Sequence, residues 1–172
     1  LEIAKKCEID GILTFTDSGV VTAGYVADQL GLPMPGPYES IQILQNKGLF
    51  RKFLAEHGFN VPKAKSYFSA EQAWGERDEW QYPVIVKPVD SAGSKGVTKV
   101  DLSEKLLDAI HFALEFSISG EFIIEAWIEK DGCSSDSDCF SLNGEFQILT
   151  YSSQRFDSAA PNPYAPAAFS WP

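Results

Sequence analysis

A glycine- and serine-rich turn between two β-prone runs constrains this chain more than any other feature of its sequence. Tyr82–Pro88 (YPVIVKP) has the strongest strand character and presents Lys87 near its end, and Val97–Val100 is a second short strand candidate. The segment between them, DSAGSKG, contains two glycines and two serines. Small residues let backbone N–H groups approach an anion closely, and a lysine adds a point charge. The pattern predicts a phosphate cradle, with a plain glycine-rich hairpin and an exposed lysine as the alternative.

Two common phosphate-binding motifs are absent from the sequence. There is no G-x-x-x-x-G-K-[ST] loop, and there is no G-x-G-x-x-G fingerprint opening a helix. The glycine-rich turn leads into a strand instead. The missing fingerprint disfavours a Rossmann-type oxidoreductase.

A carboxylate interrupts a second apolar run. Phe122–Ile128 (FIIEAWI) reads as a strand, and Glu125 lies in its middle. A buried carboxylate is costly unless it is partnered, so this position is a candidate for accepting a hydrogen bond from an amino group such as that of adenine. Strand alternation allows the alternative that Glu125 lies on a solvent-exposed face.

Charge is unevenly distributed over the 172 residues, whose formal net charge is −10. Residues 40–99 carry 9 basic and 6 acidic side chains and form the one positive stretch, which is compatible with an anion site. The overall acidity argues against a nucleic-acid binder, and no apolar run is long enough for a membrane helix. The three cysteines form no CxxC pair, which favours reduced thiols in a cytoplasmic protein.

The order of the predicted elements defines an α/β (α+β) protein. Met34–Pro37 (MPGP) is a hinge and a plausible domain boundary. After Phe156 we expect a loop as far as Trp171. The predicted helices cover residues 1–8, 20–30, 40–45, 47–57, 69–74 and 103–116, and the predicted strands cover 11–16, 64–68, 82–88, 97–100, 122–128 and the hairpin 139–151.

Taken together, these segments resemble the ATP-grasp superfamily, and more closely its branch similar to the carbamoyl-phosphate synthase large subunit. The helix that opens with Lys47, the strand ending at Lys87, the Gly93–Gly96 turn and the strand around Glu125 follow in that family's order. The resemblance covers residues 36–172 and implies a lid at about 64–120 and part of a C-terminal subdomain at about 121–172. Residues 1–35 resemble the last βα unit of a Rossmann-like pre-ATP-grasp domain.

The resemblance also implies roles for individual residues. Lys47 and Lys87 would contact nucleotide phosphates, and the 90–97 loop would fold over them as a mobile turn. Glu125 would bind the adenine amino group, and Glu129 or Asp131 would bind the ribose. The other implied nucleotide contacts are Gly93, Ser94, Lys95 and Gly96 in the turn and Ala126, Trp127 and Ile128 in the hinge.

The implied activity is that of a ligase that forms an acylphosphate from MgATP and a small carboxylate, in an assembly that can be oligomeric. The Mg²⁺ ligands, a Glu and a Glu-x-Asn, are expected beyond residue 172, so no catalytic or metal-binding residue is assigned and the chain is expected to be an inactive fragment. A non-catalytic nucleotide-binding or interaction module is the alternative. Ser134–Asp138 and the 159–169 loop receive no role.

Overall fold

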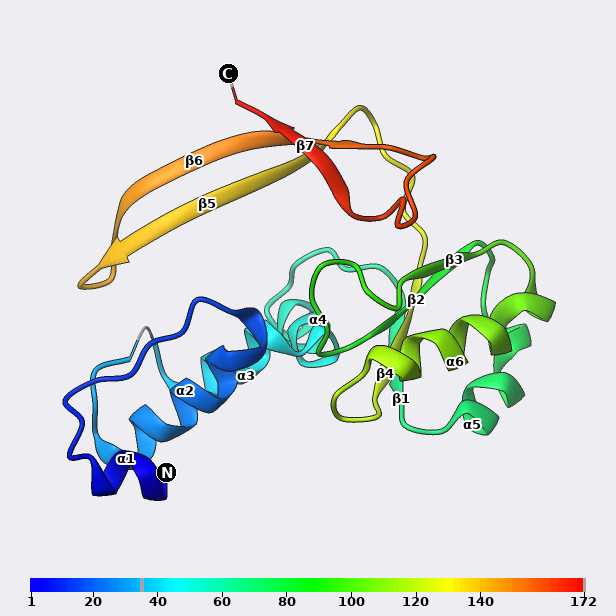
Figure 1. Ribbon diagram of the computed structural model, residues 1–172. Helices are drawn as coiled ribbons and strands as arrows, with labels where there is room; N and C mark the ends of the chain where they lie inside the picture. The colour runs from blue at the N-terminus through cyan, green and yellow to red at the C-terminus, as the bar shows by residue number, and fades with distance from the viewer. Residues whose placement is uncertain (35, 172) are drawn as a thin grey trace. The chain divides into compact units, whose positions relative to one another are not determined.

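The computed structural model describes residues 1–34 and 36–171, which form two compact units that divide after Trp127 (Figure 1). Pro35, in the predicted hinge, and Pro172 lie outside the described residues. The first unit contains, in chain order, α1 (Glu2–Lys6), α2 (Asp17–Leu30), α3 (Tyr38–Gln45), α4 (Lys47–Glu56), β1 (Ala64–Tyr67), α5 (Ala70–Gly75), the 3-10 turn η1 (Arg77–Glu79), β2 (Val84–Pro88), β3 (Thr98–Val100), the 3-10 turn η2 (Ser103–Lys105), α6 (Leu106–Phe116) and β4 (Phe122–Ala126).

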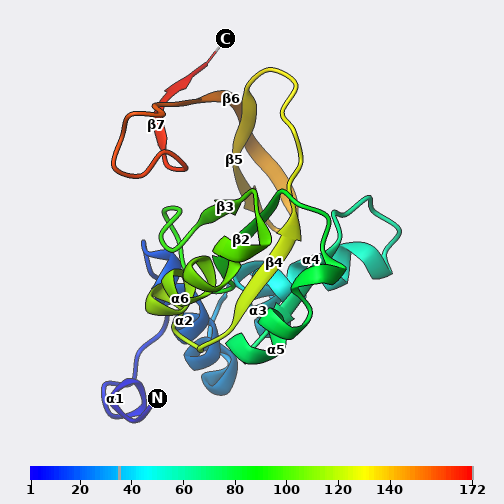
Figure 2. The ribbon, with the colours of Figure 1, turned by 90° about the vertical axis from the view of Figure 1, so that its right-hand side faces the viewer.

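The first unit is built on a four-stranded antiparallel sheet of order β1-β4-β2-β3, of which Figure 2 labels β4, β2 and β3. The last strand along the chain, β4, therefore lies inside the sheet and pairs with β1 on one side and β2 on the other. The sequence had assigned β4 to the C-terminal subdomain. It pairs with two strands of the predicted lid, β1 and β2, and the predicted boundary between the lid and the C-terminal subdomain stays a prediction.

One face of this sheet carries the hydrophobic core. Helices α5 and α6 cover that face, and strand alternation turns every second residue of β2 and β4 toward them. The buried cluster consists of Tyr67, Ala73, Trp80, Val84, Val86, Val100, Leu106, Ala109, Ile110, Ala113, Phe122 and Ile124. The residues between them on β2 and β4 consequently point to the opposite face.

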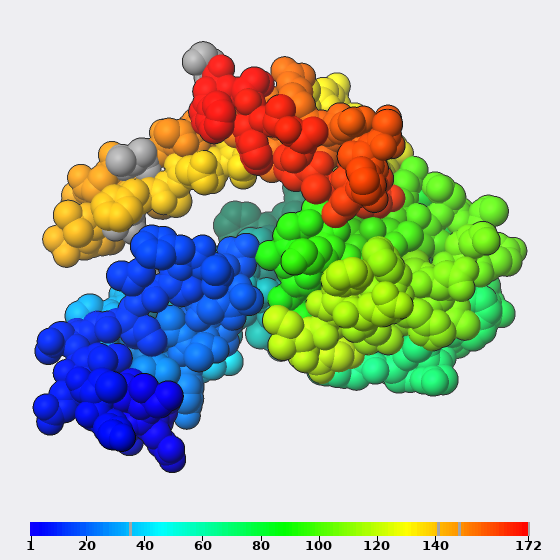
Figure 3. Space-filling view, in the orientation of Figure 1, coloured from blue at the N-terminus to red at the C-terminus, as the bar shows by residue number. Residues whose placement is uncertain are grey.

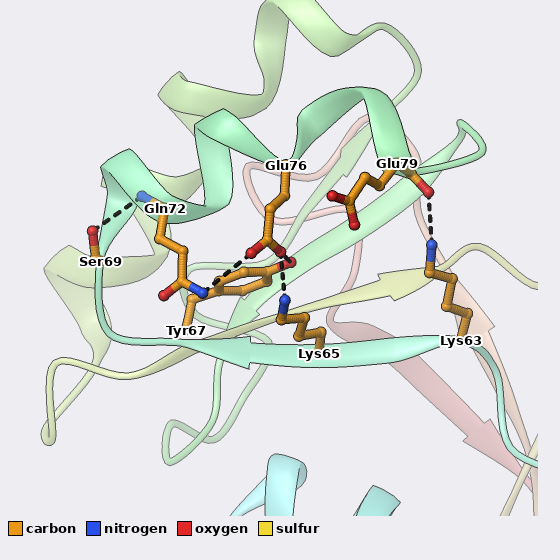
Figure 4. Close-up of polar contacts among 7 residues, drawn as sticks. All are labelled: Lys63, Lys65, Tyr67, Ser69, Gln72, Glu76 and Glu79. Atoms are coloured by element: carbon orange, nitrogen blue, oxygen red, sulfur yellow. Dashed lines mark hydrogen bonds and ion pairs between the residues drawn. The ribbon is translucent and has the colours of Figure 1, made fainter.

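A polar network fastens α5 to the edge strand β1 (Figure 4). The Glu76 carboxylate accepts hydrogen bonds from Lys65 Nζ at 2.6 Å, Tyr67 Oη at 2.8 Å and Gln72 Nε2 at 3.2 Å. Ser69 Oγ caps α5 by accepting from the Gln72 N–H at 3.1 Å, as the sequence predicts. The three donors hold the pKa of Glu76 down to about 2.

The N-terminal segment confirms the predicted helices but not the predicted strand. Helix α2 ends at Gly31, which adopts the left-handed φ of 64° that glycine tolerates. Residues 11–16 form no strand, and Leu13 and Phe15 are 72% and 96% exposed. A lone β-prone run pairs only if a neighbouring strand supplies hydrogen bonds, and within the described residues no strand lies beside it. In Figure 3 this N-terminal part (blue) forms a lobe beside the lobe built on the sheet (green).

The second unit is a three-stranded antiparallel sheet of order β5-β6-β7. Strands β5 (Ser134–Leu142) and β6 (Glu145–Phe156) form the predicted hairpin, and Asn143 and Gly144 adopt the positive φ values of its turn. Strand β7 (Pro166–Ser170) pairs with the end of β6, so the prediction of a continuous loop after Phe156 is wrong. Its sequence, PAAFS, has little strand propensity, and pairing with the free edge of β6 overrides it.

Candidate functional site

The face of the four-stranded sheet away from the core carries the candidate site. In the β2–β4 register Glu125 lies opposite Ile85, and Lys87 lies opposite Ile123. Lys87 and Glu125 are therefore diagonal neighbours on one face, a spacing that long side chains can bridge. The strand pairing brings together two residues that the sequence assigned to different parts of a nucleotide site.

Helix α4 supplies two cations to the same place. Asn46 caps the helix by accepting from the Leu49 N–H at 3.0 Å, and its own Nδ2 donates to Glu121 Oε2 at 3.2 Å. Lys47 and Arg51 lie four residues apart along the helix, so both project from one side of it. The cap fixes the start of the helix, and hence the position of both side chains.

Glu125 is the centre of a buried ion-pair cluster. Its Oε1 accepts from Arg51 Nε at 2.7 Å and its Oε2 from Lys87 Nζ at 2.6 Å. The Glu125 side chain is only 4% exposed, against 28% for Arg51 and 16% for Lys87. The alternative of a solvent-facing Glu125 is therefore wrong. A carboxylate this buried depends on its two partners, because an unpaired buried charge is strongly destabilising.

Lys47 lies beside this cluster and is bound to the start of the glycine-rich loop. Its Nζ donates to Ser91 O at 2.7 Å and to Val89 O at 3.4 Å, and its backbone N–H donates to the same Val89 oxygen at 2.9 Å. Burial lowers the pKa of the Lys47 ammonium, and the nearby charge of Lys87 lowers it further, against the opposing effect of Asp90 and Glu125. An anion bound near the Lys47 ammonium would oppose this lowering and favour its charged form.

The base of the glycine-rich loop is held by Asp90. Its Oδ1 accepts from Ile118 N at 3.0 Å and Ser117 Oγ at 3.2 Å, and its Oδ2 accepts from Ser119 N at 2.7 Å. Partial burial pushes the pKa of Asp90 upward, but these hydrogen bonds outweigh it and hold the pKa below its ordinary value. Asp90 therefore ties the loop after β2 to the turn between α6 and β4.

The tip of the loop has the backbone that its glycines predict. Gly93, Ser94 and Gly96 have φ values of 67°, 55° and 70°. At Gly96 a Cβ atom would also lie 3.1 Å from Pro88 Cδ and from Phe116 Cβ, so a larger residue is disfavoured there on two grounds. Lys95, at the tip, is exposed. Whether this loop is mobile stays a prediction.

The predicted adenine hinge follows Glu125. The N–H of Ala126 donates to Lys63 O at 2.8 Å and that of Trp127 to Pro83 O at 3.1 Å, so the sheet itself uses both donors. Lys99 Nζ lies 4.9 Å from the centre of the Trp127 ring, in a cation–π contact. Ile128 and Glu129 are exposed and belong to the second unit. Asp131 and the segment Ser134–Asp138 also belong to that unit, and the segment forms the first part of β5.

A cleft of about 360 Å³ runs between α4 and β1, next to the cluster. Arg51, Ser66 and Glu121 line it. Among the described residues, Ser66 Oγ is buried and has no hydrogen-bond partner. A Cβ atom on Gly48 would lie 2.3 Å from that oxygen, so glycine permits the close approach of α4 to β1.

Sequence reasoning missed Arg51 and Asp90 as parts of the site. Arg51 is separated from Glu125 by 74 positions, and only the packing of α4 against the sheet brings the two together. The available signal was that Arg51 lies one helical turn after Lys47 and so shares its side of the helix. Asp90 was predicted to begin the loop, but its partners, Ser117, Ile118 and Ser119, could not be predicted from the sequence.

Residues 44–166 match the family described as "ATP-grasp domain", and the chain belongs to that family. The chain is 28% identical over 111 residues to a carbamoyl phosphate synthase large chain of Thermoanaerobacter sp. (strain X514), covering 62% of this chain and 10% of that protein. It is 29% identical over 160 residues to a D-alanine–D-alanine ligase of Natranaerobius thermophilus, and the match covers 82% of this chain and 42% of that protein.

The fold is also similar to that of solved ligases. The crystal structure of an L-amino acid ligase from Bacillus licheniformis matches with a TM-score of 0.70 and 21% identity over 97% of this chain and 39% of that one. The chain thus spans well under half the length of these relatives.

The described part of the chain offers no group of three or more His, Cys, Asp or Glu side chains able to hold a metal ion, so no magnesium site is assigned to it. Cys7, Cys133 and Cys139 are free thiols on the surface. None of the helices in residues 1–34 and 36–171 is long and apolar enough to span a membrane.

Proposed function

We propose that this chain is the nucleotide-binding part of an ATP-dependent ligase. One observation carries the proposal: Lys87 and Arg51 contact a single buried carboxylate, Glu125, and Lys47, whose ammonium binds the start of the glycine-rich loop, lies beside them. Three cations and a glycine-rich turn suit the polyphosphate of a nucleotide. Membership of the ATP-grasp family supports the same assignment.

In the proposed reaction of the whole protein, a substrate carboxylate oxygen attacks the γ-phosphorus of ATP. The bond from that phosphorus to the β-γ bridging oxygen breaks, and ADP leaves with the electron pair. The resulting acylphosphate is then attacked by an amine, which releases inorganic phosphate. Lys47 and Lys87 stabilise negative charge on the phosphates and transfer no proton. Magnesium, when bound, would neutralise further phosphate charge.

Calorimetric titration with ATP tests the binding site. Lys87→Met removes one of the phosphate-binding cations and should weaken ATP binding by about tenfold or more, since a hydrogen bond to a charged group is worth about 1.5–3 kcal/mol. Lys52→Met is the matched control, because Lys52 lies on α4 with a side chain 71% exposed. Equal ATP affinities for wild type, Lys87→Met and Lys52→Met would refute the site.

The ligase assignment is tested separately from nucleotide binding. An acylphosphate formed by the whole protein reacts with hydroxylamine, so ADP release should be accompanied by a hydroxamate when the carboxylate substrate is present. Nucleotide binding without ADP release or hydroxamate, under any carboxylate tested on the whole protein, would favour the non-catalytic binding module.

A further inference from the structure

Both oxygens of the carboxylate that we assign to adenine recognition are already engaged. Arg51 Nε contacts Glu125 Oε1 at 2.7 Å, and Lys87 Nζ contacts Oε2 at 2.6 Å, in a position almost closed to solvent. An adenine amino group that approached Oε2 would have to share it with the ammonium or displace it. The question is which partner of Glu125 can leave.

The two cations differ in the stiffness of their side chains. Arg51 projects from a capped helix, and its planar guanidinium has a fixed direction of donation. Lys87 carries its charge on a flexible four-carbon chain and is followed, after Pro88 and Val89, by the glycine-rich loop. Lys87 is therefore the partner that can move.

A phosphate group bound at this site would attract the Lys87 ammonium away from Glu125. Lys47 lies close enough for the charge of Lys87 to lower its pKa, so the two ammonium groups repel each other. A polyphosphate between them removes that repulsion and carries more negative charge than one carboxylate. Phosphate thus competes with Glu125 for Lys87.

We propose that nucleotide binding exchanges the ion pair of Lys87 from Glu125 to phosphate, and that this exchange frees Glu125 Oε2 to accept the adenine amino group. Arg51 stays on Oε1 throughout as a positioning residue, keeping the carboxylate in place. The exchange rests on the proposed function, because it describes how the same site responds to its nucleotide. It makes the adenine and phosphate halves of ATP bind cooperatively.

The cooperativity is measurable with separate halves of the ligand. In wild type, saturating inorganic pyrophosphate should raise the affinity for adenosine by about tenfold, the equivalent of about 1.4 kcal/mol. In Glu125→Gln, which keeps the shape and loses the charge, that enhancement should disappear. Calorimetric titration of adenosine with and without pyrophosphate gives both values.

Two variants should shift pyrophosphate affinity in opposite directions. Glu125→Gln releases Lys87, so pyrophosphate should bind about tenfold more tightly than to wild type. Arg51→Met leaves Lys87 as the one cation on Glu125, so Lys87 is held more firmly and pyrophosphate should bind more weakly. Arg51→Lys, which restores the charge, should recover most of the wild-type affinity. If the cluster had a purely structural role, Glu125→Gln and Arg51→Met would both bind pyrophosphate more weakly than wild type does.

The outcomes separate the exchange from the proposed function. If wild type binds ATP but Glu125→Gln binds pyrophosphate no more tightly, or if adenosine affinity does not respond to pyrophosphate in wild type, the exchange is wrong and the nucleotide site stands. If wild type does not bind ATP, both are wrong. Circular dichroism melting curves establish which variants fold. If Glu125→Gln does not fold, the effect of pyrophosphate on the adenosine affinity of wild type still decides whether the exchange occurs.

Discussion

Lys47 shows how strongly a single side chain in this site depends on its surroundings. Its ammonium is partly buried, is bound to two backbone carbonyls and lies near the charge of Lys87. Burial acts first and the charge of Lys87 second, and both lower its pKa. Lys47 consequently loses its proton at a lower pH than a lysine in water does, and an anion bound beside it reverses that shift.

This environment predicts a pH dependence of nucleotide binding. Because bound phosphate raises the lowered pKa of Lys47, ATP binding at alkaline pH should take up protons, and ATP affinity should fall as pH rises through the pKa of the free protein. Calorimetry in two buffers of different ionisation enthalpy measures the uptake. In Lys47→Arg the guanidinium stays charged at every accessible pH, so the proton uptake on ATP binding should disappear. Identical proton uptake in wild type and Lys47→Arg would contradict this origin.

At the scale of elements, α5 is joined to β1 by one carboxylate. Glu76 contacts Lys65 and Tyr67 of the strand, and its pKa is held down to about 2 (Figure 4). A carboxylate with a lowered pKa in the folded state stabilises the fold at pH values above its ordinary pKa. That contribution is lost as the pH falls from about 4.5 toward about 2.

Glu76→Gln should therefore lower the melting temperature at pH 7, and the difference from wild type should shrink at pH 3 and below. Glu79→Gln is the control, because Lys63 binds the backbone carbonyl of Glu79, which the substitution retains. Thermal melting followed by circular dichroism from pH 2 to pH 7 measures both variants. A difference between Glu76→Gln and wild type that stays constant over this range would show that the charge of Glu76 is not involved.

Elements with local signals were predicted from the sequence, and those that depend on distant partners were not. The Ser69 cap, Gly31 at the end of α2 and the Asn143-Gly144 turn each fix local geometry, and the structure confirms all three. The run at 11–16 has strand propensity without a partner, whereas β7 has a partner without propensity. In both cases pairing decided the outcome, and propensity did not.

In the candidate site, too, residues with a local sequence signal were predicted, and contacts between distant residues were not. Lys87 and Glu125 were identifiable because each interrupts or ends an apolar strand, where a charge is unexpected. Their contact follows from a register that the sequence does not specify. Arg51 has no such local anomaly, since an arginine on an amphipathic helix is ordinary, and its role depends on a contact across 74 positions.

At the scale of the whole molecule, the two units differ in how much apolar surface they bury. The hydrophobic core cluster lies between Tyr67 and Ile124, entirely within the first unit. In the second unit several large apolar side chains are exposed, among them Phe140, Phe146, Tyr151 and Trp171. A single three-stranded sheet with so little buried apolar surface is marginally stable by itself. The Glu125 cluster, which consists of Glu125, Arg51 and Lys87, also belongs to the first unit, and so does the neighbouring Lys47.

A chain that ends at Trp127 should therefore fold and retain the phosphate half of the site. We expect its melting temperature and its pyrophosphate affinity to match those of the full chain, because the core and all three cations are present. Its ATP affinity should fall by about tenfold, since the predicted hinge and ribose contacts at Ile128 and Glu129 are removed. Calorimetry and circular dichroism measure the three quantities, with the full-length Glu129→Gln variant separating the loss of one side chain from the loss of the unit. An unfolded 1–127 chain, or one with weakened pyrophosphate binding, would show that the second unit supports the cation cluster.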